Sequence, residues 1–95
     1  MTIGTQNQIN QSHCYGIECY PQTNTESQRV AELLEQMAVN WHRRSLGYVV
    51  KENQIHVVNP PEQMRHLVKA ELACTVHLLT DLKIQSRLIN QEAKQ

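Results

Sequence analysis

Apolar and polar positions along the chain separate a polar N-terminal stretch from a patterned remainder. Residues 1–12 hold five Asn or Gln side chains and no charged residue, and their few apolar groups follow neither a helical nor a strand period. Such a stretch cannot bury enough surface to offset the entropy lost on ordering. We therefore expect residues 1–12 to form a flexible polar tail and residues 13–95 to form a single α+β domain.

The segment 13–20 has the composition of a strand, because cysteine, aromatic and β-branched side chains surround Gly16 and Pro21 follows it. We expect a short edge strand there. A helix is predicted next, from a capping-box sequence at residues 25–28 to a glycine cap at Gly47. Its apolar stripe recurs at spacings of four, three and four through Val30, Leu34, Met37 and Trp41.

Residues 48–58 consist of two β-branched arms around Glu52-Asn53, which predicts a β-hairpin. From Pro61 to about Asn90 no Gly or Pro interrupts the chain, and this predicts one long C-terminal helix. Apolar or small side chains follow it at alternating spacings of four and three, namely Val68, Leu72, Thr75, Leu79, Leu82, Ser86 and Ile89.

These elements predict an α+β fold with two helices packed on a small antiparallel sheet, built from the hairpin and the possible edge strand. A helix of about 30 residues would be about 45 Å long, which exceeds the width of a domain of this size. The helix therefore either bends near Thr80-Asp81 or projects onto another chain. An alternative architecture is a helix–hairpin–helix protomer that completes its core only as a dimer.

The second of those outcomes leads to an expected homodimer. If the helical stripe continues beyond the domain, the side chains that meet a second copy are Leu79, Leu82, Ser86 and Ile89. The formal net charge of zero makes self-association easier, because little charge repulsion opposes it.

Neutral charge lowers the expectation of nucleic-acid binding, which draws its affinity from neutralised phosphates. A local basic patch remains an alternative, because His42 closes the first helix next to two arginines and other cations follow. The patch would hold Arg43, Arg44, Lys51, Arg65 and Lys69. The same residues also suit an ordinary helix end and a solvated surface.

All three cysteines enter a second alternative, a zinc-stapled binding module. Cys14 and Cys19 stand in one segment, while Cys74 and His77 are three positions apart on the predicted helix and share a face. Two thiolates from the first segment and a helical Cys–His pair would complete a tetrahedral site. The competing interpretation is that the cysteines are small apolar side chains, and we expect no cofactor.

Catalysis has little support, since no phosphate-binding glycine loop, paired-carboxylate motif or nucleophile with a local base is present. No run of 18 apolar residues predicts a membrane span, and we expect no secretory signal, because the N-terminal residues have neither a basic nor an apolar region. Reduced thiols in such a chain indicate the cytoplasm. The sequence predicts a small non-enzymatic regulatory or adaptor protein that binds an unidentified protein, acts as a homodimer and does not contact a membrane.

Overall fold

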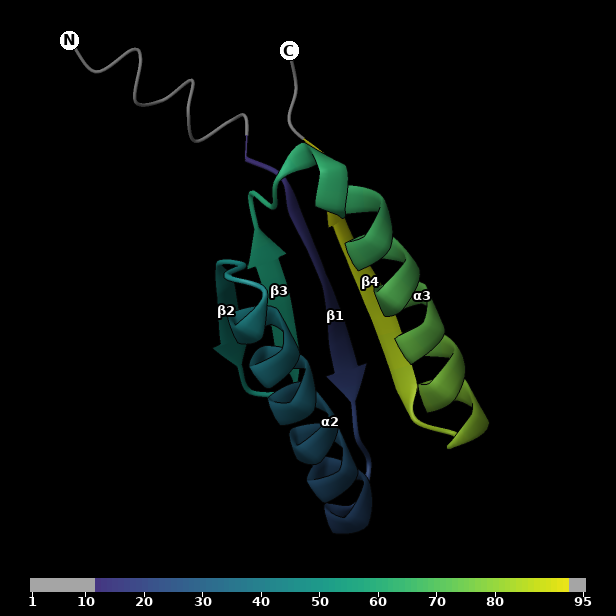
Figure 1. Cartoon of the computed structure of the whole chain (residues 1–95). Helices are drawn as coiled ribbons and strands as arrows, with labels where there is room; N and C mark the ends of the chain where they lie inside the picture. Colours follow the sequence, from purple (N-terminus) through teal and green to yellow (C-terminus); the bar gives the residue numbers. More distant parts are fainter. Residues whose placement is uncertain (1–11, 93–95) are drawn as a thin grey trace, which may run out of the picture.

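The structure, a computed structural model, describes residues 12–92, so all but one residue of the predicted tail lies outside the described part. The elements in chain order are β1 (Cys14–Tyr20), α2 (Asn24–Arg43), β2 (Tyr48–Lys51), β3 (Gln54–Val58), the 3-10 turn η1 (Glu62–Met64), α3 (Arg65–Asp81) and β4 (Gln85–Gln91). The strands form one antiparallel sheet in the order β2-β3-β1-β4 (Figure 1). This connectivity interleaves two split β-α-β units, the ferredoxin-like arrangement.

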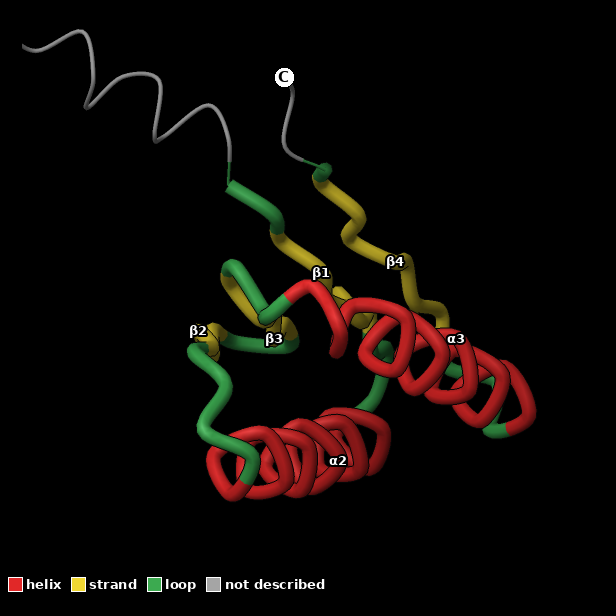
Figure 2. The backbone as a smooth tube through the Cα atoms, turned by 45° about the horizontal axis from the view of Figure 1, so that its top comes forward, coloured by secondary structure: helices red, strands yellow, loops and turns green. Residues whose placement is uncertain are grey.

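Both helices cover the same side of the sheet, so the opposite sheet face carries no helix among the described residues (Figure 2). The predicted α+β fold, with two helices on a small antiparallel sheet, is confirmed. The hairpin is confirmed as well, with Asn53 in its two-residue turn at a positive φ of 61°.

A single core lies between the sheet and the helices. Strand β1 contributes Tyr15, Ile17 and Cys19, whose side chains alternate onto the sheet face that the helices cover. The other buried residues come from both helices, β3 and the segments after each helix, namely Val30, Leu34, Met37, Trp41, Leu46, Ile55, Val57, Val68, Leu72, Leu79 and Ile84. The stripe predicted for the first helix is therefore confirmed as core, Trp41 included.

The first helix begins earlier than the sequence suggested. Thr23, not Thr25, is the N-cap, and its hydroxyl accepts a hydrogen bond of 3.1 Å from the backbone N–H of Glu26. The carboxylate of Glu26 in turn accepts from the N–H of Gln22 at 2.8 Å. Thr23 and Glu26 thus satisfy free N–H groups reciprocally, as in a capping box.

The long second helix ends at Asp81 rather than near Asn90, and residues 85–91 form strand β4. The reason is a tight C-terminal turn in which Lys83 adopts a positive φ of 62°. The N–H of Lys83 bonds to the carbonyl of Thr80, and that of Ile84 to the carbonyl of Leu79, which is the Schellman pattern. The buried contact between Ile84 and Leu79 fixes the turn, although no glycine marks it.

Helix α2 ends in the same way. Ser45 takes the positive φ of 61°, and the N–H groups of Ser45 and Leu46 bond to the carbonyls of His42 and Trp41. Leu46 is buried, as Ile84 is. Gly47, the expected cap, lies beyond the turn and has no positive φ.

Strand β1 lies in the middle of the sheet, so the expectation of an edge strand at 13–20 is wrong. It bonds to β3 on one side and to β4 on the other. The partner β4 was not expected, because the sequence pattern predicted its residues to be the end of the long second helix. Gly16 lies opposite His56, where a Cβ atom would come within 2.3 Å of the carbonyl oxygen of Ile55. Only glycine fits this close approach.

We predict that Gly16→Ala destabilises the protein by about 1–3 kcal/mol or more, because the added carbon forces β1 and β3 apart. Urea unfolding followed by circular dichroism measures the effect. Gly47→Ala is the matched control, since its Cβ would meet its nearest atom at an ordinary 3.7 Å. Equal stability of the two variants would show that the strands do not approach this closely.

We also predict that Lys83→Gly stabilises the protein by up to about 1 kcal/mol, because glycine adopts positive φ without the penalty that a side chain incurs. Lys83→Val should have the opposite effect, since a β-branched residue is disfavoured there. The midpoints of urea unfolding of both variants test the turn. A destabilised glycine variant would contradict the assigned geometry.

Candidate functional site

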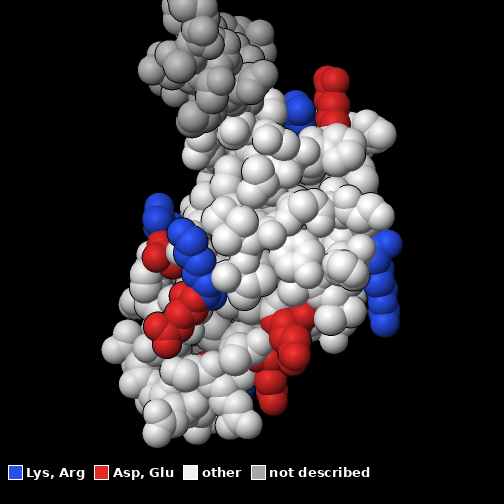
Figure 3. All heavy atoms as spheres, turned by 90° about the vertical axis from the view of Figure 1, so that its left-hand side faces the viewer, with Lys and Arg blue, Asp and Glu red and all other residues white. Residues whose placement is uncertain are grey.

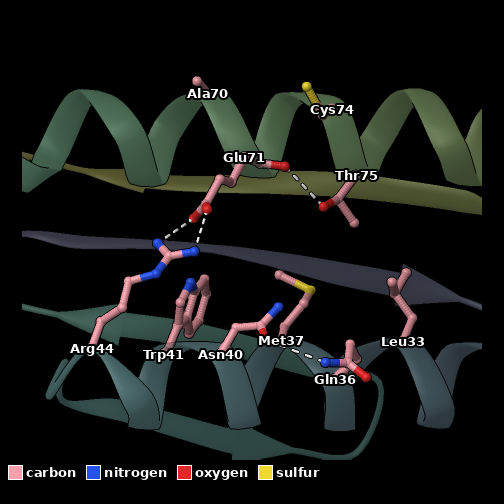
Figure 4. A pocket seen from close by; sticks show the side chains of 10 residues that line it. All are labelled: Leu33, Gln36, Met37, Asn40, Trp41, Arg44, Ala70, Glu71, Cys74 and Thr75. Atoms are coloured by element: carbon pink, nitrogen blue, oxygen red, sulfur yellow. Dashed lines mark hydrogen bonds and ion pairs between the residues drawn. The ribbon is translucent and has the colours of Figure 1, made fainter.

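An apolar groove runs between α2 and α3. Its volume is about 390 Å³. Figure 4 shows its walls: side chains of α2 and α3 face each other across it, with Cys74 and Ala70 pointing away at its outer rim. The lining residues are Leu33, Gln36, Met37, Asn40 and Trp41 from α2, Arg44 at the C-cap of α2, and Ala70, Glu71, Cys74 and Thr75 from α3.

The groove exists because the two helices rest on different strands. Helix α2 packs on β2 and β3, whereas α3 packs on β1 and β4. Met37 and Trp41 form the apolar floor, and both are nearly inaccessible to solvent. The stripe that builds the core thus also supplies the bottom of the groove.

An ion pair bridges the groove near one end. Arg44 donates two hydrogen bonds to the carboxylate of Glu71, at 3.0 and 2.5 Å, and both side chains are about one-third exposed. These hydrogen bonds raise the pKa of Arg44 above its ordinary value. Two-point pairing of this kind fixes the spacing of the helices at this end more firmly than a single contact would.

The outer rim of the groove is apolar on the α3 side. Leu67 comes four residues before Glu71, and Leu78 comes four residues after Cys74. Residues four apart lie on the same side of a helix, so both leucines lie on the side of α3 that carries Glu71 and Cys74. They are 49% and 48% exposed. Leu82, at the end of the helix, extends this exposed row. We call Leu67, Cys74, Leu78 and Leu82 the leucine rim.

The groove offers shape and apolar surface rather than reactive groups. Its only ionic side chains are Arg44 and Glu71, which neutralise each other. The amides of Gln36 and Asn40 bond to each other at 3.3 Å and supply polar contacts at the edge. Such a lining suits the burial of an apolar partner surface.

A second cluster of polar side chains lies at one end of the sheet, where β1 begins and β4 ends. The buried Tyr15 donates a hydrogen bond of 2.6 Å to Glu92, and His13 lies 3.1 Å from the Tyr15 hydroxyl and 3.2 Å from Glu92. Lys69 forms an ion pair with Glu92 and places its ammonium 4.9 Å from the centre of the Tyr15 ring.

This arrangement sets the charge state of two groups. Burial, with the hydrogen bond to Glu92, raises the pKa of Tyr15 to about 12. Hydrogen bonds from Lys69 and Tyr15 lower the pKa of Glu92 to about 2. Tyr15 is thus a donor and Glu92 an acceptor across the neutral range, and the cluster fastens the end of β4 to β1 and α3.

The four residues of the zinc hypothesis are not brought together. Cys14 and Cys19 are five positions apart on β1, so they point to opposite faces of the sheet, and Cys19 is buried in the core. Cys74 and His77 are exposed on α3. Within residues 12–92, no group of three or more His, Cys, Asp or Glu side chains is placed to hold a metal ion.

The five basic residues do not form one patch. Arg44 is paired with Glu71 and Lys69 with Glu92, while the guanidinium of Arg65 bonds to the carbonyl of Pro60 at 3.3 Å. Arg43 and Lys51 lie on different elements, at the end of α2 and the end of β2. Figure 3 shows the side of the molecule around β2, where basic side chains stand apart or next to acidic ones.

The expected dimer residues are also separated, because the helix that would have aligned them ends at Asp81. Leu79 is buried in the core, and Leu82 is part of the leucine rim. Ser86 and Ile89 are three residues apart on β4 and therefore lie on opposite faces of the sheet. These four residues cannot form one interface stripe.

Sequence reasoning missed the groove, its ion pair and the Tyr15–Glu92 cluster. Arg44 and Glu71 are 27 positions apart, and Tyr15 and Glu92 are 77 apart, so no local pattern links them. The one local signal for the groove was a second row of apolar residues on α3, beside the buried stripe. Leu67, Cys74 and Leu78 form this row, with the spacing of the buried stripe shifted by one position.

We predict that Glu92→Gln removes part of the acid dependence of stability. A carboxylate with a lowered pKa stabilises the fold above the unfolded-state pKa of about 4.5, and this contribution is lost as the pH falls toward about 2. The wild type should therefore exceed Glu92→Gln in stability at pH 7, and the difference should shrink between pH 4.5 and 2. Urea titrations across this range test it, with exposed Glu52→Gln as the control. A difference independent of pH would contradict the assignment.

Comparison with known protein families, curated proteins and solved structures found no match. No helix among residues 12–92 has the length and apolarity needed to cross a membrane. The ferredoxin-like connectivity supports many unrelated activities and does not select one. The groove and the surfaces around it are the features of residues 12–92 that bear on function.

Proposed function

We propose that this protein is a non-enzymatic regulatory or adaptor protein that binds an amphipathic helix of another protein in the groove between α2 and α3. The observation that carries the proposal is the leucine rim, a row of exposed apolar side chains along the side of α3 that borders the groove. Helix-in-groove binding uses this combination of an apolar floor and apolar anchors at helical spacing.

The dimensions support a helical occupant. The groove follows α2 from Leu33 to Arg44, a rise of about 17 Å, which equals about three turns of helix. Apolar side chains at i, i+3 or i+4, and i+7 of a partner would reach the floor at Met37 and Trp41. The paired Arg44 and Glu71 close one end and give the groove a direction.

The polar features favour a neutral or weakly charged segment. The groove has no unpaired ionic lining residue, and Gln36 and Asn40 provide amide groups at its edge. A strongly acidic or basic segment would find no complementary charge there. The separated basic residues likewise give less support to nucleic-acid binding than to protein binding.

A cross-linking experiment tests this function. With Cys14 replaced by serine, Cys74 is the exposed thiol at the groove rim, since Cys19 is buried. A photoactivatable maleimide on Cys74 should capture a partner from host extract, and the captured site should map to an amphipathic helix. A matched protein with the label on Val49→Cys in a Cys74→Ser background should not capture it, because Val49 lies on the sheet face without helices.

A peptide of the captured helix should then change the fluorescence of Trp41, the single tryptophan of the chain and part of the groove floor. Leu78→Arg should weaken its binding about tenfold or more, because a buried leucine contributes about 1.5–3 kcal/mol. Val49→Arg should leave binding unchanged. Capture of a non-helical segment, or binding without a change in Trp41 fluorescence, would contradict the proposal.

A further inference from the structure

Within residues 12–92, the outer edge of β4 is a long strand edge with no paired neighbour. β4 is one end of the sheet order β2-β3-β1-β4, and its seven residues pair with β1 without a bulge. It contains no proline and no lysine, and its single charged residue, Arg87, bonds to Glu18 at 2.8 Å. Natural edge strands usually carry bulges, prolines or free charges that prevent pairing with another chain.

The register shows which backbone groups of β4 are free to pair. The N–H of Cys19 bonds to Asn53, and the carbonyl of His13 accepts from Asn59, so the odd-numbered residues of β1 bond toward β3. Its even-numbered residues therefore bond toward β4, where Gly16 is opposite Ile89 and Glu18 opposite Arg87. The N–H and C=O groups of Ser86, Leu88 and Asn90 consequently point away from the sheet.

The sequence of β4 is nearly symmetric about Leu88. An antiparallel pair of two β4 strands centred there places Leu88 opposite Leu88, Ser86 opposite Asn90, and Gln85 opposite Gln91. The outward-pointing backbone groups fall in register in this arrangement, since Ser86, Leu88 and Asn90 all belong to the hydrogen-bonded positions. No like charges meet at these three pairings, and the chain as a whole has a formal charge of zero.

Two side chains of β4 lack a contact in the single chain: Leu88 lacks apolar packing, and Ser86 lacks a hydrogen-bond partner among the described residues. Leu88 is 44% exposed, next to Lys69 and Leu72 on the side of the sheet that the helices cover. The hydroxyl oxygen of Ser86 is buried and has no hydrogen-bond partner among the described residues. The symmetric pairing buries Leu88 against its copy and places a side-chain amide of the partner opposite Ser86, within the reach of cross-strand side-chain pairs.

The side of α3 that would face a second copy carries mostly small side chains. Leu67, Glu71, Cys74 and Leu78 lie on the α2 side of α3, so the opposite side, above the β4 edge, carries Lys69, Ala73, Val76 and Thr80. Three of these four side chains are small or of moderate size, which permits two α3 helices to approach across a two-fold axis.

We propose that two copies of this protein form a homodimer by antiparallel pairing of their β4 strands, with Leu88 on the two-fold axis, so that both sheets become one continuous sheet. This interface lies on the side of α3 opposite the groove, and it does not depend on the proposed function of the groove.

The test begins with the mass in solution. Analytical ultracentrifugation of the full chain at about 100 µM should give twice the chain mass of 11.0 kDa, a concentration at which a micromolar dimer is nearly complete. Leu88→Lys and Leu88→Glu should each give the monomer mass, because like charges would meet at the axis. Circular dichroism of both variants should retain the wild-type spectrum.

Mixing the two variants distinguishes the proposed register from a general loss of structure. An equimolar mixture should regain the dimer mass, since the lysine introduced in one subunit would then face the glutamate introduced in the other. Val50→Lys is the matched control, because Val50 is an exposed apolar residue of the other edge strand, on the same side of the sheet, and this variant should remain a dimer. A monomeric wild type, a dimeric Leu88→Lys, a monomeric Val50→Lys or a mixture that stays monomeric would each overturn the proposal.

Discussion

The position of β1 in the middle of the sheet is the constraint on which the rest of the structure depends. Its inward residues, Tyr15, Ile17 and Cys19, are buried beneath the helices, and its two edges hold β3 and β4. The strand tolerates this position because Gly16 lets the backbone of β3 come close. Each helix crosses from one strand to another on the same sheet face, so the spacing of the strands also determines the separation of the helices and hence the groove.

The periodic parts of the fold were predictable from sequence because their signals are local. The α2 stripe, the hairpin and most of α3 follow from the spacing of apolar residues alone. The end of α3 was not predictable in this way, since the turn at Lys83 uses a lysine where glycine is the usual signal. The heptad spacing then continued by coincidence through Ser86 and Ile89, which alternate to opposite faces of a strand. The sequence signal for both turns is an apolar residue shortly after the helix, Leu46 after α2 and Ile84 after α3, which is buried in the structure.

The candidate site was less predictable than the fold, because it joins residues that are distant in sequence. Arg44 was recognised as a cation, but its partner Glu71 becomes visible only when α2 and α3 lie on one sheet face. Because Glu71 neutralises Arg44, this arginine does not contribute a free positive charge to the basic patch that the sequence suggested. The cysteines failed to converge for a related reason, since alternation along β1 separates Cys14 from Cys19. The predicted protein-binding and dimeric roles remain proposals, now attached to the groove and to the edge of β4.

The pairing of β1 with β4 also bears on how the protein folds. Tyr15 and Glu92 are joined by a hydrogen bond across 77 positions, and the whole β1–β4 ladder connects the beginning of the domain to its end. Contacts of such long sequence separation slow folding, because the segment from Tyr15 to Glu92 must close into a loop before they form. During synthesis, one edge of β1 stays unpaired until β4 has left the ribosome. The order of synthesis thus leaves the most interior strand as the last to be completed, and the nascent chain exposes it for the longest time.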